Sequence, residues 1–343
     1  MRTVRLLLVS PQFRTYWQAI ARAFRQKGYT VDTYVYDARP SVLGKVHHKL
    51  RFELPDRLSS RSSGARALST WITDRAARAV SESRADIVVV IKGDVLGEAF
   101  WDAVEARGAK TVTWFYDELR RMAPRTTNPE HLARRRAIAT YSAQDAQALA
   151  LQLGADVPVV HLPLAFDSSL RFSPRSSAEI SFIGARYGER ERLLSSLVQA
   201  GVPSRAYGRD WSRHPVDLMR TWSLRRPSVP ASRDLDRADA YAVMAGSSAT
   251  INVHGDQDGF TMRTFEACGV GGLQLIDRGD VSKLYEPGYE LLVFDSVEEL
   301  VDLSRRALID KTWSTAIRNA GRRRTLSEHT FASRVPVLES IWS

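Results

Sequence analysis

Three carboxylates and a histidine lie close together in the stretch INVHGDQDGFTMRTFEACG, residues 251–269. Asp256 and Asp258 form a D-x-D pattern, a spacing that suits a divalent metal held against a diphosphate, and seven residues separate Asp258 from Glu266. Mg²⁺ prefers six oxygen ligands, and nothing nearby completes such a set. A calcium loop would need further alternating carboxylates and a terminal glutamate. The pattern favours Asp258 with Glu266 as a pair that binds a sugar nucleotide, with a metal site and a solvated loop as alternatives and Asp256 as a loop residue.

The position of this stretch between two elements supports that interpretation. An apolar strand ends at His254 and a helix is expected from near Thr261, so Glu266 would lie about one and a half turns into the helix. There its carboxylate could accept hydrogen bonds from a ribose diol, while free N–H groups at the helix start face phosphate and sugar. Charge-assisted hydrogen bonds contribute roughly 1.5 to 3 kcal/mol each. The predicted donor-binding residues here are His254, Gly259, Phe260, Thr261, Met262, Arg263 and Glu266.

A second candidate for phosphate binding is the stretch ISFIGARYGERER, residues 180–192. A strand is followed by a turn at Gly184 and then by a helix, with Arg186 and Arg190 beside the helix start. Backbone N–H groups at a helix start carry partial positive charge, and two arginines would add strong donors for a diphosphate. Any turn between a strand and a helix can carry glycine and arginine, so the alternative is a purely structural turn.

Three polar residues follow apolar strands in the first half of the chain. Gln12 follows VRLLLVS, Lys92 follows DIVVVI and Asp117 follows TVTWFY. Ligands of doubly wound sheets bind at the carboxyl ends of the strands, so these residues are candidates for the acceptor side of a site. Asp117 would act as a base if it reached an acceptor hydroxyl directly or through one water. The alternative is that all are structural residues at strand ends.

Several other kinds of chemistry lack their motifs. The sequence contains no GxxxxGK[ST], HExxH, GxSxG or CxxC pattern. Its one cysteine, Cys268, permits no internal disulfide and stands where a small helix residue packs against a sheet. His329 is predicted to be a packing or capping residue. No metal or cofactor is expected.

Strands and helices alternate along the chain and must position these residues. Continuous apolar strands such as VRLLLVS and DIVVVI alternate with helical patterns such as YWQAIARAFRQKG, which predicts parallel sheets covered on both faces. The periodicity is lost in residues 166–179, which are predicted to link two domains of similar size. Residues 41–63 have weak periodicity and are predicted to form a long loop or a loosely attached helix.

The composition and apolar runs of the chain exclude disordered and membrane-spanning proteins, and its charge excludes no further class of protein. The 343 residues are 44% hydrophobic and 26% charged, and the longest apolar runs are far shorter than the ~20 residues that a spanning helix needs. The net charge of +10 comes almost wholly from arginine and would attract phosphates of nucleic acid, lipid headgroups or nucleotides. Arginines on solvated helix faces explain this net charge better than a phosphate-bearing partner does. The N-terminus resembles a first strand rather than a secretory signal. The single cysteine predicts a reducing, cytoplasmic location, with peripheral contact at the inner membrane face as an option.

The order of these motifs resembles that of the CgeB-like glycosyltransferases. The resemblance begins near Ala85 and includes ADIVVVIKGDVL, AKTVTWFYDE, ISFIGARYGERERLL, INVHGDQDGFTMRTFEACGVGGLQLIDR and SEHTFASR. It implies an α/β protein with the GT-B fold, in which two Rossmann-like domains face each other across a cleft and the last helix crosses back to the first domain. The implied domains are residues 1–168, residues 178–328 and a C-terminal helix, residues 329–343.

The resemblance also implies roles for the candidate residues. Glu266 would hold the donor ribose, Arg186 and Arg190 would hold the diphosphate, and the first domain would bind the acceptor. Asp258 stands where related retaining transferases place a glutamate, so its contact with the sugar is one methylene shorter. The implied reaction moves a sugar from a nucleoside diphosphate sugar to an unknown acceptor, with retention and without metal.

Two other functions compete with this one. A nucleotide-sugar epimerase can share the GT-B architecture and would convert the sugar without any acceptor. A non-catalytic protein could use the basic surface to dock on an anionic membrane or on nucleic acid, of which nucleic acid is the less expected partner.

Overall fold

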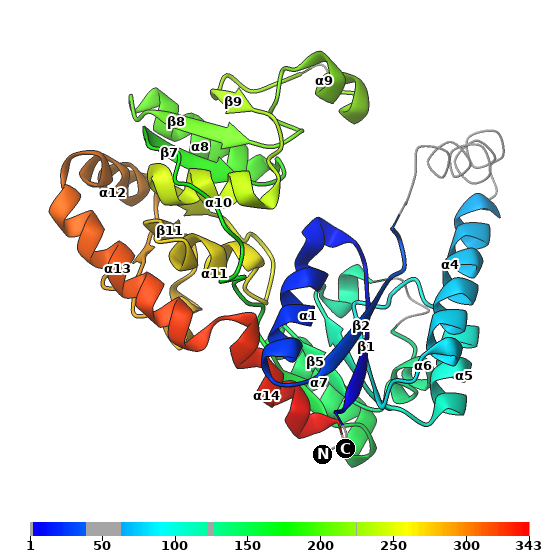
Figure 1. Cartoon of the computed structure of the whole chain (residues 1–343). Helices are drawn as coiled ribbons and strands as arrows, with labels where there is room; N and C mark the ends of the chain where they lie inside the picture. Colours follow the sequence, from blue (N-terminus) through cyan, green and yellow to red (C-terminus); the bar gives the residue numbers. More distant parts are fainter. Residues whose placement is uncertain (1–2, 39–62, 123–126, 224, 343) are drawn as a thin grey trace. The chain divides into compact units, whose positions relative to one another are not determined.

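The computed structural model describes residues 3–38, 63–122, 127–223 and 225–342 (Figure 1). The chain folds into two compact units, one formed by residues 1–163 with 334–343 and the other by residues 164–333. Almost all of the predicted loop at 41–63 lies outside the described residues, which resume at Ser63. None of the described helices is long and apolar enough to cross a membrane.

The first unit contains a six-stranded sheet in the order β2-β1-β3-β4-β5-β6, and every neighbouring pair is parallel. The all-apolar strand Ile87–Ile91 lies at its centre and is buried along its whole length, as expected for a sheet covered on both faces. The strands are β1 (Arg5–Ser10), β2 (Thr30–Val35), β3 (Ile87–Ile91), β4 (Lys110–Phe115), β5 (Ile138–Thr140) and β6 (Val159–His161). The helices are α1 (Tyr16–Gln26), α4 (Ser63–Glu82), α5 (Glu98–Arg107), α6 (Pro129–Ala133) and α7 (Ala143–Leu153).

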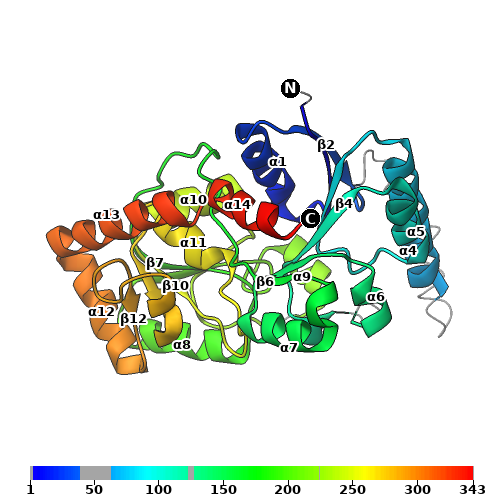
Figure 2. The same cartoon turned by 90° about the horizontal axis from the view of Figure 1, so that it is seen from below.

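The C-terminal helix α14 (Phe331–Ile341) completes this unit. Its face of the sheet also carries α1, while α4 and α5 cover the opposite face (Figures 1 and 2). The Trp342 ring stacks on Phe24 of α1 with 5.8 Å between centroids, and the Tyr29 hydroxyl donates to Glu339 Oε1 over 2.7 Å. Arg334 Nε donates to the Pro163 carbonyl over 2.9 Å. The prediction that the last helix returns to the first domain is therefore confirmed.

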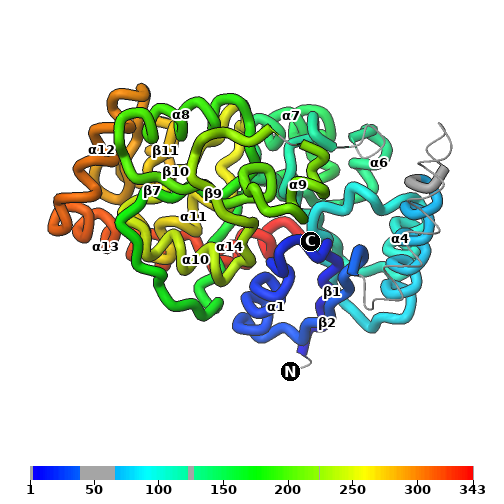
Figure 3. The backbone as a smooth tube through the Cα atoms, turned by 90° about the horizontal axis from the view of Figure 1, so that it is seen from above, coloured from blue at the N-terminus to red at the C-terminus, as the bar shows by residue number. Residues whose placement is uncertain are grey.

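The second unit contains another six-stranded parallel sheet, in the order β12-β11-β10-β7-β8-β9. Helices α10, α11 and α13 cover one face and α8 and α12 the other (Figures 2 and 3). The strands are β7 (Ser177–Ile183), β8 (Ser204–Tyr207), β9 (Ala231–Ser232), β10 (Ser247–Asn252), β11 (Gln274–Ile276) and β12 (Leu292–Val293). The helices are α8 (Gly188–Gln199), α9 (Pro215–Thr221), α10 (Arg237–Gly246), α11 (Met262–Gly269), α12 (Val297–Ile309) and α13 (Lys311–Glu328).

Small residues let α11 pack closely against its neighbours. A Cβ on Gly269 would lie 2.5 Å from the Phe166 ring, so that position excludes any side chain. Cys268 is fully buried beside it, and burial raises the pKa of its thiol well above the usual range. His329 is also buried, against the Phe265 and Tyr285 rings, with Nε2 3.1 Å from the Leu284 carbonyl oxygen. Both residues therefore pack the core, as their sequence context predicts.

Candidate functional site

The loop between β10 and α11 is anchored by Asp277, which follows the neighbouring strand β11. Its two carboxylate oxygens accept from the His254 backbone N–H over 3.1 and 3.0 Å, and Oδ2 accepts from the Gly255 N–H over 3.5 Å. His254 Nδ1 lies 3.2 Å from Asp277 Oδ1. One side chain thus fixes the point at which the chain leaves the sheet.

The buried His254 ring connects that point to the start of α11. Its Nε2 lies 3.4 Å from the Thr261 backbone nitrogen and 3.1 Å from Thr264 Oγ1, and the side chain is 0% exposed. A backbone N–H can only donate, so Nε2 is an acceptor and the proton resides on Nδ1, which donates to Asp277. Of the helix-start N–H groups predicted to face a ligand, that of Thr261 is therefore already used by His254.

Glu266 lies inside α11, just over one turn from the first helical residue, Met262. The residue is 0% exposed, and Arg263 Nη1 donates to its Oε2. A buried carboxylate is costly unless it is paired and hydrogen-bonded, so such a group in the helix that follows a strand-end loop is a candidate for function. The Arg263 side chain is 21% exposed, so this ion pair reaches the protein surface.

Arg278 holds the middle of the loop. Its Nη1 donates to the carbonyl oxygens of Gln257 and Asp258 over 2.6 and 2.7 Å, and its guanidinium lies 4.2 Å from the Phe260 ring centroid. The neighbouring Gly259 is buried. Sequence reasoning did not select Arg278, because one arginine among many carries no signal until the strand order places it beside the loop.

The D-x-D residues lie on the outer part of this loop. Asp256 is exposed and Asp258 is partly buried. In the parts of the chain that the structure describes, no group of three or more His, Cys, Asp or Glu side chains could hold a metal ion. Within that part of the chain, no further His, Cys, Asp or Glu side chain joins Asp256 and Asp258 in such a group.

The turn between β7 and α8 brings Gly184, Arg186 and Arg190 to the same edge of the sheet. Arg190 Nε and Nη2 donate to the Val253 carbonyl over 3.1 and 2.6 Å, and Nη1 donates to Ala185 over 3.1 Å. Burial lowers the pKa of Arg190. Because guanidinium carries five N–H groups, these three bonds leave two for a ligand. Arg190 thus connects the two loops predicted to bind the donor.

Arg186 lies on the outer side of the same turn. Its Nη1 donates to the Arg225 carbonyl over 3.0 Å, and Nε lies 3.4 Å from Glu191 Oε2. A Cβ on Gly184 would approach the Phe182 ring to 3.1 Å, so the turn passes close over the end of β7.

In the first unit, Lys92 and Asp117 meet at the carboxyl ends of β3 and β4. Lys92 Nζ lies 2.7 Å from Asp117 Oδ2 and 3.6 Å from Asp94 Oδ2. Burial alone would lower the pKa of Lys92, but the hydrogen bond and charge of Asp117 and Asp94 outweigh it and the pKa is raised. The Asp117 side chain remains 42% exposed.

The third predicted residue of this edge is not part of that cluster. Gln12 is exposed after β1, and its backbone N–H donates to Asp37 Oδ1. Sequence reasoning also missed Arg135, buried between the Trp101 and Phe115 rings at 4.6 and 5.1 Å from their centroids. Burial lowers the pKa of Arg135 to about 10.

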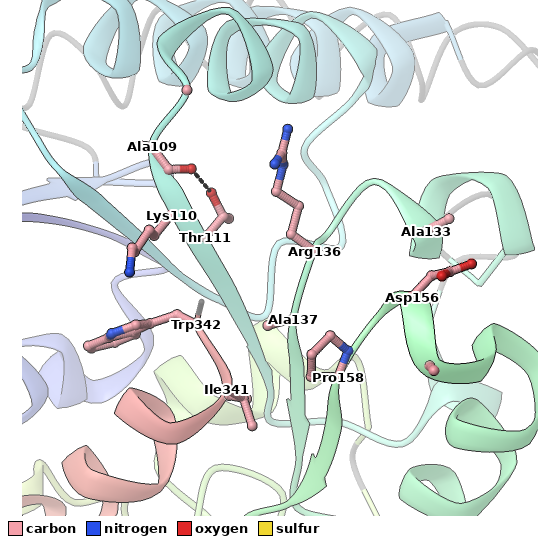
Figure 4. Close-up of a pocket in the computed structure, with 12 residues that line it drawn as sticks. Ala109, Lys110, Thr111, Ala133, Arg136, Ala137, Asp156, Pro158, Ile341 and Trp342 are labelled. Atoms are coloured by element: carbon pink, nitrogen blue, oxygen red, sulfur yellow. Dashed lines mark hydrogen bonds between the residues drawn. The ribbon is translucent and has the colours of Figure 1, made fainter.

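A hollow of about 350 Å³ lies at the opposite end of the first sheet (Figure 4). Lys110, Ala137 and Pro158 line it at the amino ends of β4, β5 and β6, together with Trp342. None of the predicted site residues lines this hollow. It is therefore separate from the strand-end clusters.

Part of the chain is similar to a known protein family. Residues 188–340 match the family model described as glycosyl transferase-like. The match covers less than half of the chain and most of the second unit. It contains the whole β10–α11 loop, His254, Glu266 and Asp277. A search of curated proteins by sequence found no significant match.

Solved structures similar to this chain match it over nearly its whole length. Sucrose-phosphate synthase from Thermosynechococcus elongatus is 12% identical, with 98% of each chain covered and a TM-score of 0.65. HepE from Anabaena, solved with UDP and glucose, is 13% identical, with 98% of this chain and 99% of that chain covered and a TM-score of 0.59. A Listeria monocytogenes protein described as a UDP-N-acetylglucosamine 2-epimerase is 10% identical, with 98% and 95% covered and a TM-score of 0.55. With the two parallel sheets, these likenesses confirm the predicted GT-B fold.

Proposed function

We propose that this protein transfers a sugar from a nucleoside diphosphate sugar to an acceptor hydroxyl, with retention and without a metal. The match to the glycosyl transferase-like family supports the reaction class. The observation that carries the donor site is the fully buried Glu266, just over one turn into a helix whose start is fixed by His254 and Asp277.

The donor would bind along the carboxyl edge of the second sheet. Glu266 would accept hydrogen bonds from the ribose diol after the partly exposed Arg263 side chain, which donates to its carboxylate, moves aside. Arg186 and the two unused N–H groups of Arg190 would hold the diphosphate, neutralising the charge that grows on the leaving group. HepE, a structural neighbour, was solved with UDP and glucose, which supports a donor of this chemical class.

The reacting sugar would lie near the outer part of the same loop. Asp258 would contact it from a backbone position that Arg278 fixes through the Asp258 carbonyl. On the acceptor side, Asp117 is exposed enough to reach a hydroxyl, and Lys92 orients its carboxylate. Gln12 remains a proposed acceptor contact from the loop after β1.

The test compares Glu266→Gln with Glu286→Gln, a change at an exposed residue of the same unit. Calorimetry would measure the affinity of each variant and of the wild type for UDP, GDP, dTDP and ADP sugars. We expect Glu266→Gln to weaken binding by at least about tenfold, the loss of one charge-assisted hydrogen bond, and Glu286→Gln to change nothing. Unchanged affinity of Glu266→Gln for every donor that the wild type binds would overturn the assignment.

A nucleotide-sugar epimerase is the second candidate, favoured by the full-length likeness to the Listeria protein described as an epimerase. The two reactions are separated by incubating the protein with the donor alone. An epimerase converts the sugar without any acceptor, whereas a transferase gives at most slow hydrolysis.

A further inference from the structure

A surface feature of the second unit lies outside the proposed chemistry. Residues 209–233, here called the basic arm, follow β8 and include α9 and the edge strand β9 (Figure 3). The sequence predicts only an irregular basic stretch here; the structure adds a short helix, begun by the His214 cap and Pro215. The arm contains six arginines and two aspartates. One of the two, Asp217, is buried and already paired with Arg233.

Internal bonds give the arm a defined shape. Trp211 is buried, and its Nε1 donates to the Gly184 carbonyl over 3.0 Å. Arg226 Nε donates to the Ser212 carbonyl over 2.8 Å, and Nη2 donates to Thr221 Oγ1 over 2.7 Å. The side chains on its outer surface are therefore displayed by a folded element.

Two large apolar side chains lie on that outer surface. Met219 is 64% exposed and Trp222, three residues further along, is 83% exposed, the highest value among the large apolar side chains of the described residues. Trp222 also has φ +50°, a left-handed conformation that is unfavourable for a bulky residue. Exposing an aromatic side chain in this way costs free energy in water and is typical of surfaces that bind a partner.

Cationic side chains surround this apolar pair in sequence. Arg209, Arg220 and Arg225 are exposed, and within the described part of the chain their side chains form no hydrogen bond or ion pair. Their charge is therefore available to a partner. An anionic partner that also accepts apolar side chains complements such a surface.

We propose that the basic arm docks on an anionic membrane surface. Trp222 and Met219 would enter the boundary between headgroups and acyl chains, and the three arginines would contact lipid phosphates. A soluble polyanion would satisfy the arginines but would leave the apolar pair in water. Because Arg186 of the proposed donor turn donates to the Arg225 carbonyl, docking would place that turn next to the lipid surface.

The first experiment measures binding of the full chain to vesicles by flotation. Vesicles of phosphatidylcholine alone are compared with vesicles that also contain phosphatidylglycerol, at low and high salt. We expect binding only to the anionic vesicles, weakened by salt. Met219→Ser with Trp222→Ser, and separately Arg209→Glu with Arg220→Glu and Arg225→Glu, should each weaken binding by roughly tenfold or more.

Matched controls separate this surface from the general charge of the protein. Ile309→Ser removes an apolar side chain that is 81% exposed elsewhere in the same unit, and Arg322→Glu with Arg323→Glu reverses two exposed arginines of α13. These controls should bind like the wild type. The proposal is overturned if the wild-type protein binds neither kind of vesicle, or if the control variants lose as much affinity for anionic vesicles as the arm variants do.

A second measurement tests insertion directly. Brominated lipids should quench wild-type tryptophan fluorescence. Trp222→Phe should remove most of that quenching while keeping vesicle binding, since the ring remains apolar. Quenching that persists in Trp222→Phe would overturn insertion at this residue. Binding of heparin or RNA with an affinity comparable to that for vesicles, unchanged by the Met219→Ser and Trp222→Ser changes, would assign the arm to a soluble polyanion instead.

Discussion

At the residue scale, one aspartate controls the geometry of the proposed donor loop. Asp277 accepts from the backbone N–H groups of His254 and Gly255 and from His254 Nδ1. His254 in turn accepts from the Thr261 N–H at the start of α11. Asp277 never needs to touch a ligand to affect binding, because it acts through the histidine.

We predict that Asp277→Asn weakens donor binding by about tenfold and destabilises the second unit by about 1–3 kcal/mol. The amide NH₂ of asparagine would face N–H donors, so at least one hydrogen bond is lost and the loop shifts. Asp302→Asn is the control, since that side chain of α12 is 80% exposed and pairs with Arg305 of the same helix. Calorimetry and urea denaturation measure both effects. Equal donor affinity of the two variants would contradict the positioning role.

A second residue-scale prediction concerns Tyr29, whose hydroxyl donates to Glu339 of the C-terminal helix. Burial and the neighbouring Glu339 carboxylate raise the pKa of Tyr29 from 10.0 to about 12. The folded state thus favours the neutral phenol. The contribution of Tyr29 to the free energy of unfolding is therefore complete below pH 10 and is lost as the pH rises from 10 through 12. The difference in urea midpoint between wild type and Tyr29→Phe should be constant below pH 10 and shrink above it. A difference that grows with pH would contradict this sign.

At the element scale, two turns of the second sheet depend on a close backbone approach. A Cβ on Gly208, after β8, would lie 2.6 Å from the Gly184 carbonyl oxygen after β7. That carbonyl also accepts from Trp211 Nε1. The absent side chain at Gly208 therefore sets the position of the turn that carries Arg186 and Arg190.

We predict that Gly208→Ala costs about 1–3 kcal/mol of stability, because a backbone atom must move to relieve the overlap. Donor affinity should fall with it, since the shifted turn carries the proposed diphosphate ligands. Gly279→Ala is the matched control, because nothing lies within 4 Å of its Cβ. Urea denaturation and donor calorimetry compare the variants. A fully stable Gly208→Ala that binds donors normally would show that the turn position is not critical.

Much of this element-scale organisation could be predicted from the sequence. Apolar runs and helical periodicity predict the strands, and the strand-end rule leads directly to His254, Lys92 and Asp117. The bonds to Asp277 and Arg278 could not be predicted, because they depend on β11 lying beside β10, which no local pattern specifies. The hydrogen bonds from Arg190 to the Val253 carbonyl could not be predicted for the same reason, since Val253 is 63 residues away in the sequence. The helix α9 was missed because seven residues give too short a periodic pattern.

At the scale of the whole molecule, the proposed donor residues belong to one unit. Binding to the native state alone stabilises a protein by about 2.7 kcal/mol when the ligand is at 100 times its Kd. We predict that the matching nucleoside diphosphate sugar raises the melting temperature, with or without EDTA. Hydrogen exchange should slow in residues 184–190 and 254–266. A stabilisation that EDTA abolishes would contradict the metal-free proposal.

The return of α14 to the first unit has a consequence for the order of synthesis. Residues 334–343 belong to the same compact unit as residues 1–163, yet the ribosome makes them only after all of the second unit, residues 164–333. Domains generally fold as the chain emerges, starting from the N-terminal end. Here the second unit is made in full before the first is complete, and Phe24 lacks its Trp342 partner until residue 342 has been made. The nascent first unit must therefore keep an apolar surface uncovered on the ribosome, where chaperones have their longest opportunity to bind it.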